Sequence, residues 1–316
     1  MNQSFANDVL NGLSSEFKSV PSKYFYDDKG SRLFQKIMEM PEYYLTECEF
    51  EIIDTNKSAI LNYFQDKSEK FNLIEFGAGD GLKTNILLEY FSKENADFNY
   101  VPIDISQKAL DQLKNKISEK KYKISYKPIN DDYFKALHSL KNGDRRRKNI
   151  ILFLGSNIGN FKNLEAIHFL RSIRKEIQPG DMLFIGFDLK KDPEIILNAY
   201  NDEKGITKAF NLNLLKRIND ELGGEFDTEK FMHYPNYDPV SGETKSFLIS
   251  KELQKVRVNE LNRSFTFKQF EPVFLEISQK YDFRMISNFA SNSGFQEIKT
   301  FMDKRNYFTN MIWEAV

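Results

Sequence analysis

A glycine-rich segment follows the first strongly apolar run of the chain and has the composition of a ligand-binding turn. The run 72–76 (NLIEF) passes directly into the sequence EFGAGDGLKT, residues 75–84. Glycine adopts backbone conformations that are closed to other residues, and it lets the main chain approach a bound molecule closely. We therefore expect a ligand to bind against the backbone of this turn.

The spacing of the loop favours one kind of ligand. A dinucleotide fingerprint requires G-x-G-x-x-G and a phosphate loop requires Gly directly before Lys-Thr, but Leu82 occupies both of those glycine positions. The pattern acidic-x-Gly-x-Gly-x-Gly, from Glu75 to Gly81, is instead typical of enzymes that bind S-adenosyl-L-methionine (SAM). We expect Gly77 and Gly79 to make room for the methionine part of SAM, although a generic tight turn would also account for the glycines.

Side chains after the next two strand-like runs offer the other contacts that SAM needs. Asp104 ends the segment YVPID and is placed to accept hydrogen bonds from the ribose hydroxyls, while Asp132 and Tyr133 could hold and stack the adenine. Lys83 opens a predicted helix, where a cation opposes the helix dipole. A ligand carboxylate would offset this cost, which favours a binding role for Lys83.

The segment LGSNIGN, residues 154–160, leaves the most apolar of the strand-like runs. In an open parallel sheet the ligand binds outside the carboxyl ends of the strands, so this polar exit is expected to face the reacting end of the cofactor. Capping of the next helix by Asn160 or Asn163 is the alternative. A cap would account for one asparagine but not for the whole segment.

A sheet must position these residues, and the pattern of apolar residues in the middle of the chain predicts one. Near-continuous apolar runs that alternate with amphipathic segments predict a doubly wound parallel α/β sheet. A final pair of strands after a helix near 282–291 gives the layout of a seven-stranded methyltransferase sheet. The expected strands are 72–76, 100–105, 122–129, 149–154, 181–188, 295–301 and 307–314, and the helices between the first five are 84–91, 106–120 (with Ser106 as N-cap) and 164–177.

Two further parts of the chain have different patterns. Residues 1–65 read as helices and loops, and residues 192–280 begin with helices, one of them at 206–222, and then change to period-two segments. The expected divisions are an N-terminal helical segment (1–65), a SAM-binding domain (66–191), an inserted α+β unit (192–280) and a C-terminal completion of the sheet (281–316). The strands expected in the insertion are 244–250, 255–258, 264–267 and 274–280.

Composition excludes several classes of protein. The 316 residues carry 45 basic and 46 acidic side chains, so no strong overall field attracts nucleic acid or an anionic membrane. The basic stretch KNGDRRRK, residues 141–148, lacks interleaved aromatics and is best interpreted as a solvated loop. One cysteine and three widely separated histidines predict neither a disulfide nor a metal site. Without a membrane span or a secretory signal, we expect a cytoplasmic monomer.

With these residues in view, the whole chain resembles the SAM-dependent histidine Nα-methyltransferases of ergothioneine biosynthesis. The most specific similarity is N-terminal, in PSKYFYDDKGSRLF (21–34) and MPEYYLT (40–46). Further similar segments are FLGSNIGN (153–160), NAYND (198–202), AFNLN (209–213) and LEIS (275–278). The resemblance implies a Rossmann-like class I methyltransferase sheet that binds SAM. It also implies that the N-terminal helices and the insertion form a substrate domain.

The resemblance also implies roles for single residues in methyl transfer to the α-amine of an amino acid, L-histidine by preference. Tyr43, Asn160 and Tyr200 would hold the amine and carboxylate, with Asn160 and Tyr43 nearest the chemistry. The side-chain ring would be held by Tyr26, Glu276 and Ser278. The cofactor positions are Gly77, Gly79, Lys83, Asp104, Asp132 and Tyr133.

Three departures from the family pattern keep alternatives open. The loop GAGDGLKT replaces a Ser/Thr-rich version, Asn157 stands where Thr is common, and Ser246 stands where a larger Met would shape the pocket. The last of these leaves open another aromatic amino acid, such as tryptophan, or another small amine. A SAM-binding protein without this activity is a further alternative. A nucleic-acid methyltransferase is disfavoured by the charge balance and by the absence of an Asn-Pro-Pro-aromatic motif.

Overall fold

The structure, a computed structural model, describes residues 3–65, 70–79, 81–120, 122, 124–141 and 147–316. The chain forms two compact units, each built from two separate stretches of sequence. Unit 1 comprises Met1–Tyr44 and Lys191–Gln279, and unit 2 comprises Leu45–Lys190 and Lys280–Val316. Most of the basic stretch 141–148 lies outside the described residues.

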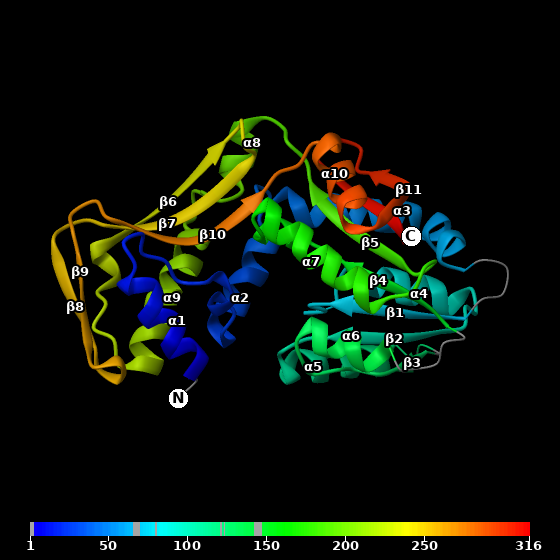
Figure 1. The fold of residues 1–316 in the computed structure, drawn as a ribbon, viewed down its shortest axis with the longest axis horizontal. Helices are drawn as coiled ribbons and strands as arrows, with labels where there is room; N and C mark the ends of the chain where they lie inside the picture. The colour runs from blue at the N-terminus through cyan, green and yellow to red at the C-terminus, as the bar shows by residue number, and fades with distance from the viewer. Residues whose placement is uncertain (1–2, 66–69, 80, 121, 123, 142–146) are drawn as a thin grey trace. The chain divides into compact units, whose positions relative to one another are not determined.

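Unit 2 contains a seven-stranded sheet with the order β11-β12-β5-β4-β1-β2-β3 (Figure 1). The pairs among β1 to β5 are parallel, and β12 runs antiparallel to both of its neighbours. The Rossmann-like α/β architecture expected from the sequence is thereby confirmed. The strands are β1 Phe71–Phe76, β2 Phe98–Ile103, β3 Ser125–Tyr126, β4 Lys148–Phe153, β5 Met182–Asp188, β11 Phe295–Met302 and β12 Phe308–Ala315.

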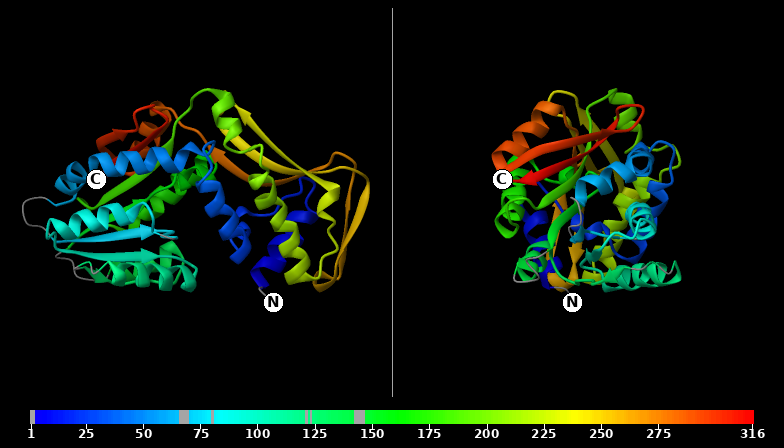
Figure 2. Two further views of the ribbon diagram at one scale, coloured as in Figure 1. Left: turned by 180° about the vertical axis from the view of Figure 1, so that it is seen from behind. Right: turned by 90° about the vertical axis from the view of Figure 1, so that its right-hand side faces the viewer.

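Helices cover both faces of this sheet, which explains why its central strands are apolar almost without interruption. One face packs against α6, α7 and α10 through a continuous core that includes Phe153, Phe169 and Phe289. On the other face, Phe64 of α3 and Phe91 of α4 pack edge-on against aromatic rings of the strands. Figure 2 shows α3 running along the sheet. The helices are α3 Tyr44–Phe64, α4 Thr84–Lys93, α5 Gln107–Glu119, α6 Tyr133–Lys141, α7 Asn163–Glu176 and α10 Phe283–Ser293.

Unit 1 combines the N-terminal helices with the inserted segment around a single apolar core. Its antiparallel sheet has the order β10-β7-β6, and β8 and β9 form a separate hairpin. The segment after α1 attaches to the edge of β10, where the N–H of Val20 donates to the carbonyl of Phe274 at 3.0 Å. The elements are α1 Gln3–Ser14, η1 Ser22–Phe25, α2 Asp28–Met38, α8 Pro193–Asn198, α9 Ile206–Leu222, η3 Thr228–Lys230, β6 Phe231–Asp238, β7 Glu243–Ser250, β8 Gln254–Val258, η4 Asn259–Leu261, β9 Arg263–Phe267 and β10 Pro272–Gln279.

Three features differ from the sequence expectations. The first division of the chain falls after Tyr44 rather than after residue 65, because α3 packs on the sheet of unit 2. The third strand is only Ser125–Tyr126 instead of 122–129. Strand β6 was not predicted, because its sequence FMHYPNYD contains a proline and few aliphatic residues. The proline is compatible with a strand because β6 lies at the edge of its sheet.

Candidate active site

The glycine loop between β1 and α4 has a backbone that its residue types require. Gly77, Gly79 and Gly81 have φ angles of +66°, +52° and +64°, in the left-handed region that favours glycine. A Cβ at Gly81 would lie 2.4 Å from Leu113 Cδ1, and one at Gly77 would lie 2.8 Å from the Tyr133 hydroxyl oxygen. A Cβ at Gly79 would meet nothing closer than 3.9 Å, so open space adjoins the loop there.

Asp104 lies just beyond β2, where the sequence predicted an acceptor for ribose hydroxyls. Its Oδ2 accepts a hydrogen bond from the Gly79 N–H at 3.1 Å, and its Oδ1 accepts one from the Ser106 N–H at 2.8 Å. The side chain is half-buried, and each carboxylate oxygen has a further lone pair. Asp104 therefore fixes the glycine loop and can still accept from a ligand.

Glu75, the acidic residue that precedes the loop, is fully enclosed rather than open to a ligand. Its carboxylate accepts hydrogen bonds from the hydroxyls of Thr84, at the start of α4, and Tyr100, on β2. Burial raises the pKa of Glu75 from 4.5 to about 7, although both hydroxyls act in the opposite direction. Glu75 thus joins β1, β2 and α4 beneath the loop.

Lys83 has a buried partner that the sequence analysis missed. Its ammonium lies 2.5 Å from Oε2 of Glu49, a residue of α3 with no exposed surface. The ammonium also lies close to the exit of β4, at 3.7 Å from a Cβ built on Gly155. Lys83 therefore stands at the carboxyl ends of β1 and β4, where a parallel sheet binds its ligand.

The two residues expected at the adenine are engaged within unit 2. Asp132 accepts hydrogen bonds from the N–H groups of Phe134 and Lys135 at 3.1 and 3.0 Å, so it caps α6. The Lys135 N–H bond is the main reason that the pKa of Asp132 lies below its ordinary value. The Tyr133 ring stacks on Phe76 with centroids 4.6 Å apart, and burial raises its pKa to about 12. One face of the Tyr133 ring is therefore already covered.

Asn160 ends a short 3-10 turn, η2 Asn157–Asn160, that follows β4. The turn begins after Gly155 and Ser156, which both have positive φ angles, of +75° and +55°. Asn160 is exposed, and neither it nor Asn163 caps α7, because the residue before the helix is Lys162. The capping role considered for these asparagines is therefore wrong, and the Asn160 side chain remains accessible at the strand exit.

The sheet of unit 1 brings together polar residues that are distant in sequence. The Tyr200 hydroxyl donates to Ser278 Oγ at 2.8 Å, and both side chains are buried. On the same strand, Glu276 pairs in register with Ser246 of β7, whose hydroxyl donates to Glu276 Oε1 at 3.3 Å. Because Glu276 and Ser278 are two residues apart on β10, their side chains share one face of the sheet.

A row of aromatic rings connects this polar group with the N-terminal segment. Tyr200 lies edge-on to Tyr43 with centroids 6.5 Å apart, and Tyr43 lies 6.2 Å from Phe34. Phe34 in turn contacts Tyr26 at 5.4 Å and Phe210 at 5.9 Å. Unit 1 thus gathers all five substrate residues that the sequence analysis assigned to it. Phe34 and Phe210 complete the row, although no role was predicted for either.

The N-terminal segment owes its position to a local helix start. Asp27 caps α2 by accepting from the Gly30 N–H at 2.6 Å, and it also accepts from the side chain of Asn213 on α9 at 2.9 Å. A Cβ at Gly30 would lie only 1.7 Å from the carbonyl oxygen of Phe25, so only glycine fits at that position. These contacts explain why the sequence YDDKG stands at the start of the helix.

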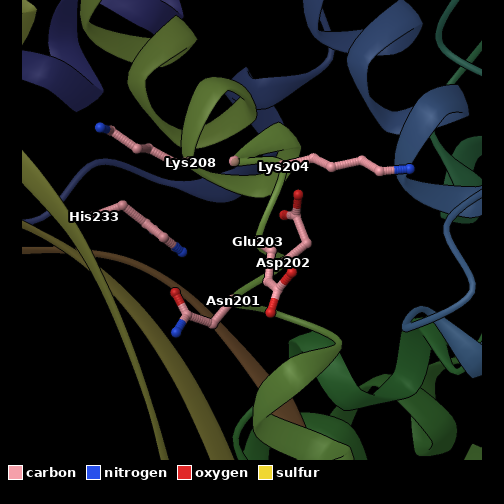
Figure 3. A pocket seen from close by; sticks show the side chains of 7 residues that line it. Asn201, Asp202, Glu203, Lys204, Lys208 and His233 are labelled. Atoms are coloured by element: carbon pink, nitrogen blue, oxygen red, sulfur yellow. The ribbon is translucent and has the colours of Figure 1, made fainter.

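A polar cavity of about 380 Å³ lies beside the Tyr200 loop, lined by side chains from that loop, from α9 and from β6 (Figure 3). Within it, His233 Nε2 donates to the Tyr200 carbonyl oxygen at 2.9 Å, and its Nδ1 accepts from Asn211 at 2.9 Å. Burial lowers the pKa of His233, which agrees with this neutral form. The cavity adjoins the polar group of β10 but does not contain Glu276 or Ser278.

The donors and acceptors of unit 2 fit SAM. Open space at Gly79, an acceptor at Asp104 and the cation of Lys83 suit the methionine, ribose and carboxylate parts of that molecule. Among the described residues, no cluster of His, Cys, Asp and Glu could hold a metal ion. Among the same residues, no helix is long and apolar enough to cross a membrane.

The sequences of two known enzymes agree with this chemistry. The chain is 31% identical to a histidine N-alpha-methyltransferase from Mycobacterium tuberculosis over 301 residues, which cover 95% of this chain and 92% of the relative. It is 32% identical to the enzyme of the same name from Mycolicibacterium smegmatis, with 88% and 85% covered. A solved S-adenosylmethionine-dependent methyltransferase from Clostridium acetobutylicum is 11% identical, with a TM-score of 0.45 and coverage of 91% and 98%.

The family described as histidine-specific, SAM-dependent methyltransferases matches residues 5–315, which is nearly the entire chain. The match includes both units, so the N-terminal helices and the insertion belong to the family pattern as much as the sheet does. The chain therefore belongs to the family of SAM-dependent, histidine-specific methyltransferases.

Proposed function

We propose that this chain transfers a methyl group from SAM to the α-amine of L-histidine. The observation that carries the choice of histidine is the polar group on β7 and β10 and beside them. In this group the Ser246 hydroxyl donates a hydrogen bond to Glu276, and the Tyr200 hydroxyl donates one to Ser278. A carboxylate and a hydroxyl on one face of a strand suit a ring that offers N–H donors. An aliphatic side chain offers no N–H donor to the carboxylate of Glu276.

We assign the substrate contacts residue by residue. Glu276 and Ser278 would bind the imidazole together with Tyr26, which Phe34 connects to Tyr43 in the aromatic row. Tyr43 and Tyr200 would bind the amine and the carboxylate of the amino acid. The exposed amide of Asn160 would accept from the amine N–H and orient the nitrogen lone pair without adding a charge.

On the cofactor side, the glycine loop, with Gly77 and Gly79, would receive the methionine part, and Lys83 would pair with its carboxylate. Asp104 would bind the ribose. Asp132 and Tyr133 would contact the adenine with only part of each side chain. Asp132 already caps α6, and one face of the Tyr133 ring is already stacked on Phe76.

The reaction requires little acid–base catalysis from the chain. Bound SAM supplies a methyl group already activated by its sulfonium. The residues above would exclude water and hold the neutral amine in line with that methyl, and such alignment accounts for a large share of the rate in reactions of this kind. Glu276 would act on the ring of the substrate and not on the amine that reacts.

Steady-state rates on histidine, tryptophan, tyrosine and leucine test the substrate. We expect histidine to be preferred to leucine by at least about tenfold, the factor that corresponds to ~1.4 kcal/mol. Glu276→Ala should reduce that ratio mainly by harming histidine, whereas Lys245→Ala, on the neighbouring strand, serves as the control. Equal rates on histidine and leucine in the wild type would refute the substrate while leaving methyl transfer intact.

Tryptophan is the second candidate, because Ser246 is small and offers a larger ring more room than a methionine would. Ser246→Met separates the two: it should lower turnover of tryptophan more than turnover of histidine.

We further propose that the enzyme acts as a cytoplasmic monomer without a nucleic-acid partner. The near-balanced charge supports the last point, and light scattering in solution would test the oligomeric state.

A further inference from the structure

Glu49 is a buried carboxylate at which three other elements of unit 2 meet, and no role has been given to it so far. It lies on α3 and has no exposed surface. Its Oε2 accepts from the Lys83 ammonium at 2.5 Å and from the Gly155 N–H at 2.8 Å. Its Oε1 accepts from the side-chain amide of Asn310 at 2.8 Å. Glu49 therefore connects α3 with the start of α4, the exit of β4 and strand β12.

The surrounding packing leaves this carboxylate no alternative position. A Cβ on Gly186 of β5 would lie 2.5 Å from Glu49 Oε1, so glycine is needed there to admit the side chain. Both oxygens are already hydrogen-bonded, and the side chain cannot reach solvent. Its negative charge is therefore held in a fixed place beside Lys83.

Glu49 and Lys83 together form a nearly neutral pair at the carboxyl ends of the strands. The Lys83 side chain is 17% exposed, whereas the Glu49 side chain is fully buried. Removal of one partner of a buried ion pair leaves the other charge uncompensated, and that charge then acts strongly on its neighbours. Without Glu49, Lys83 would add a positive charge to the site.

This charge matters because SAM and the product of methyl transfer differ in charge. SAM carries a sulfonium, and S-adenosylhomocysteine, from which the methyl has been removed, carries a neutral thioether. Only three carbon atoms separate the sulfur from the carboxylate carbon that Lys83 is proposed to bind. An uncompensated Lys83 would therefore repel SAM but not the product.

We infer that Glu49 is a positioning residue that neutralises the charge of Lys83. It thereby keeps this charge from weakening the affinity for cationic SAM relative to the affinity for the neutral product. This inference rests on the proposed function in one respect, the binding of the cofactor carboxylate by Lys83. Both carboxylate oxygens of Glu49 are bonded within the protein, so its effect on either ligand would pass through Lys83.

Isothermal titration calorimetry of SAM and S-adenosylhomocysteine on Glu49→Gln tests the inference. The measured quantity is the ratio of the SAM Kd to the S-adenosylhomocysteine Kd, because general damage to the site weakens both ligands alike. We expect this ratio to rise by about three- to tenfold, as one unit charge at a partly screened distance implies. Glu51→Gln makes the same charge change on α3 in a surface pair with Lys304 and should leave the ratio unchanged.

Two further variants make the result decisive. In the background of Lys83→Met, Glu49→Gln should bring the ratio back to the wild-type value, because neither charge of the pair is then present. If Glu49→Gln does not fold, Lys83→Met alone carries the test, and it should lower the ratio because the charge of Glu49 is then unopposed. A ratio that stays at the wild-type value in the folded single variants would overturn the inference.

The same titrations distinguish failure of the inference from failure of the proposed function. The adenosine part alone, as 5′-methylthioadenosine, lacks the carboxylate. Its affinity should be the same in the wild type and in Lys83→Met if Lys83 binds the carboxylate. Equal losses for 5′-methylthioadenosine and S-adenosylhomocysteine would refute the role of Lys83 and the inference with it. Wild-type protein that binds neither SAM nor S-adenosylhomocysteine would contradict the proposed function instead.

Discussion

The buried carboxyl of Glu75 predicts an unusual dependence of stability on pH. Its pKa is about 7 in the folded chain, and its ordinary value is 4.5. A carboxyl group with a raised pKa in the folded state binds its proton more tightly there than in the unfolded chain. Its contribution therefore favours folding at low pH and is lost as the pH rises from about 4.5 through about 7.

The size of this effect follows from the two pKa values. A difference of one pKa unit corresponds to about 1.4 kcal/mol, so this shift corresponds to about 3 kcal/mol in the free energy of unfolding between pH 4.5 and pH 8. Glu75→Gln removes the ionisable group and keeps the shape. The amide oxygen can accept from one of the two hydroxyls, and the amide NH₂ can donate to the other after that hydroxyl rotates.

Urea denaturation at several pH values measures this difference. The free energy of unfolding of Glu75→Gln minus that of the wild type should increase by about 3 kcal/mol from pH 4.5 to pH 8. Glu51→Gln, which removes a carboxylate from a surface ion pair, should vary by less than about 1 kcal/mol over the same range. A Glu75→Gln difference that is constant with pH would show that folding does not raise the pKa of Glu75.

Three further substitutions test the site and its scaffold. Asp104→Ala should weaken SAM binding by ~1.5–3 kcal/mol in calorimetry, since it also frees the Gly79 N–H; unchanged affinity in a folded variant would exclude the ribose role. Asn160→Ala should lower the rate of methyl transfer far more than SAM affinity, because the residue is exposed and caps no helix; wild-type turnover would show that Asn160 is dispensable. Gly30→Ala should lower the melting temperature, as its Cβ would collide with the Phe25 carbonyl; an unchanged melting temperature would show that the backbone relaxes freely there.

Several features of the site could be read from the sequence because they depend on neighbouring residues. The glycine loop follows from the need for positive φ angles at 77, 79 and 81, and helix starts such as Ser106 follow from local capping. The expected helix 206–222 agrees with α9, whose two ends are flanked by Gly205 and Gly223. The family resemblance added the residues that we propose for substrate binding, and no local pattern in the sequence predicts these roles.

Other features required the folded chain. Glu49 lies 34 residues before Lys83, and nothing between them in sequence indicates that they pair. Asp132 was expected to bind adenine, but the capping of α6 became evident only once the helix start was located. Strand β6 has no clear period-two apolar pattern, and its pairing with β7 alone makes it a strand.

The sequence by itself therefore determined the alternation of strands and helices, the seven-stranded sheet and the position of the cofactor loop, because periodicity and backbone sterics act over a few residues. Only the tertiary structure decided which distant side chains meet: the row from Tyr26 to Tyr200, the bond from Tyr200 to Ser278 and the buried pair of Glu49 and Lys83. Apart from the steps from Tyr26 to Phe34 and from Phe34 to Tyr43, these contacts join residues tens of positions apart or more. They form only when separate elements pack into one core, so no local pattern encodes them.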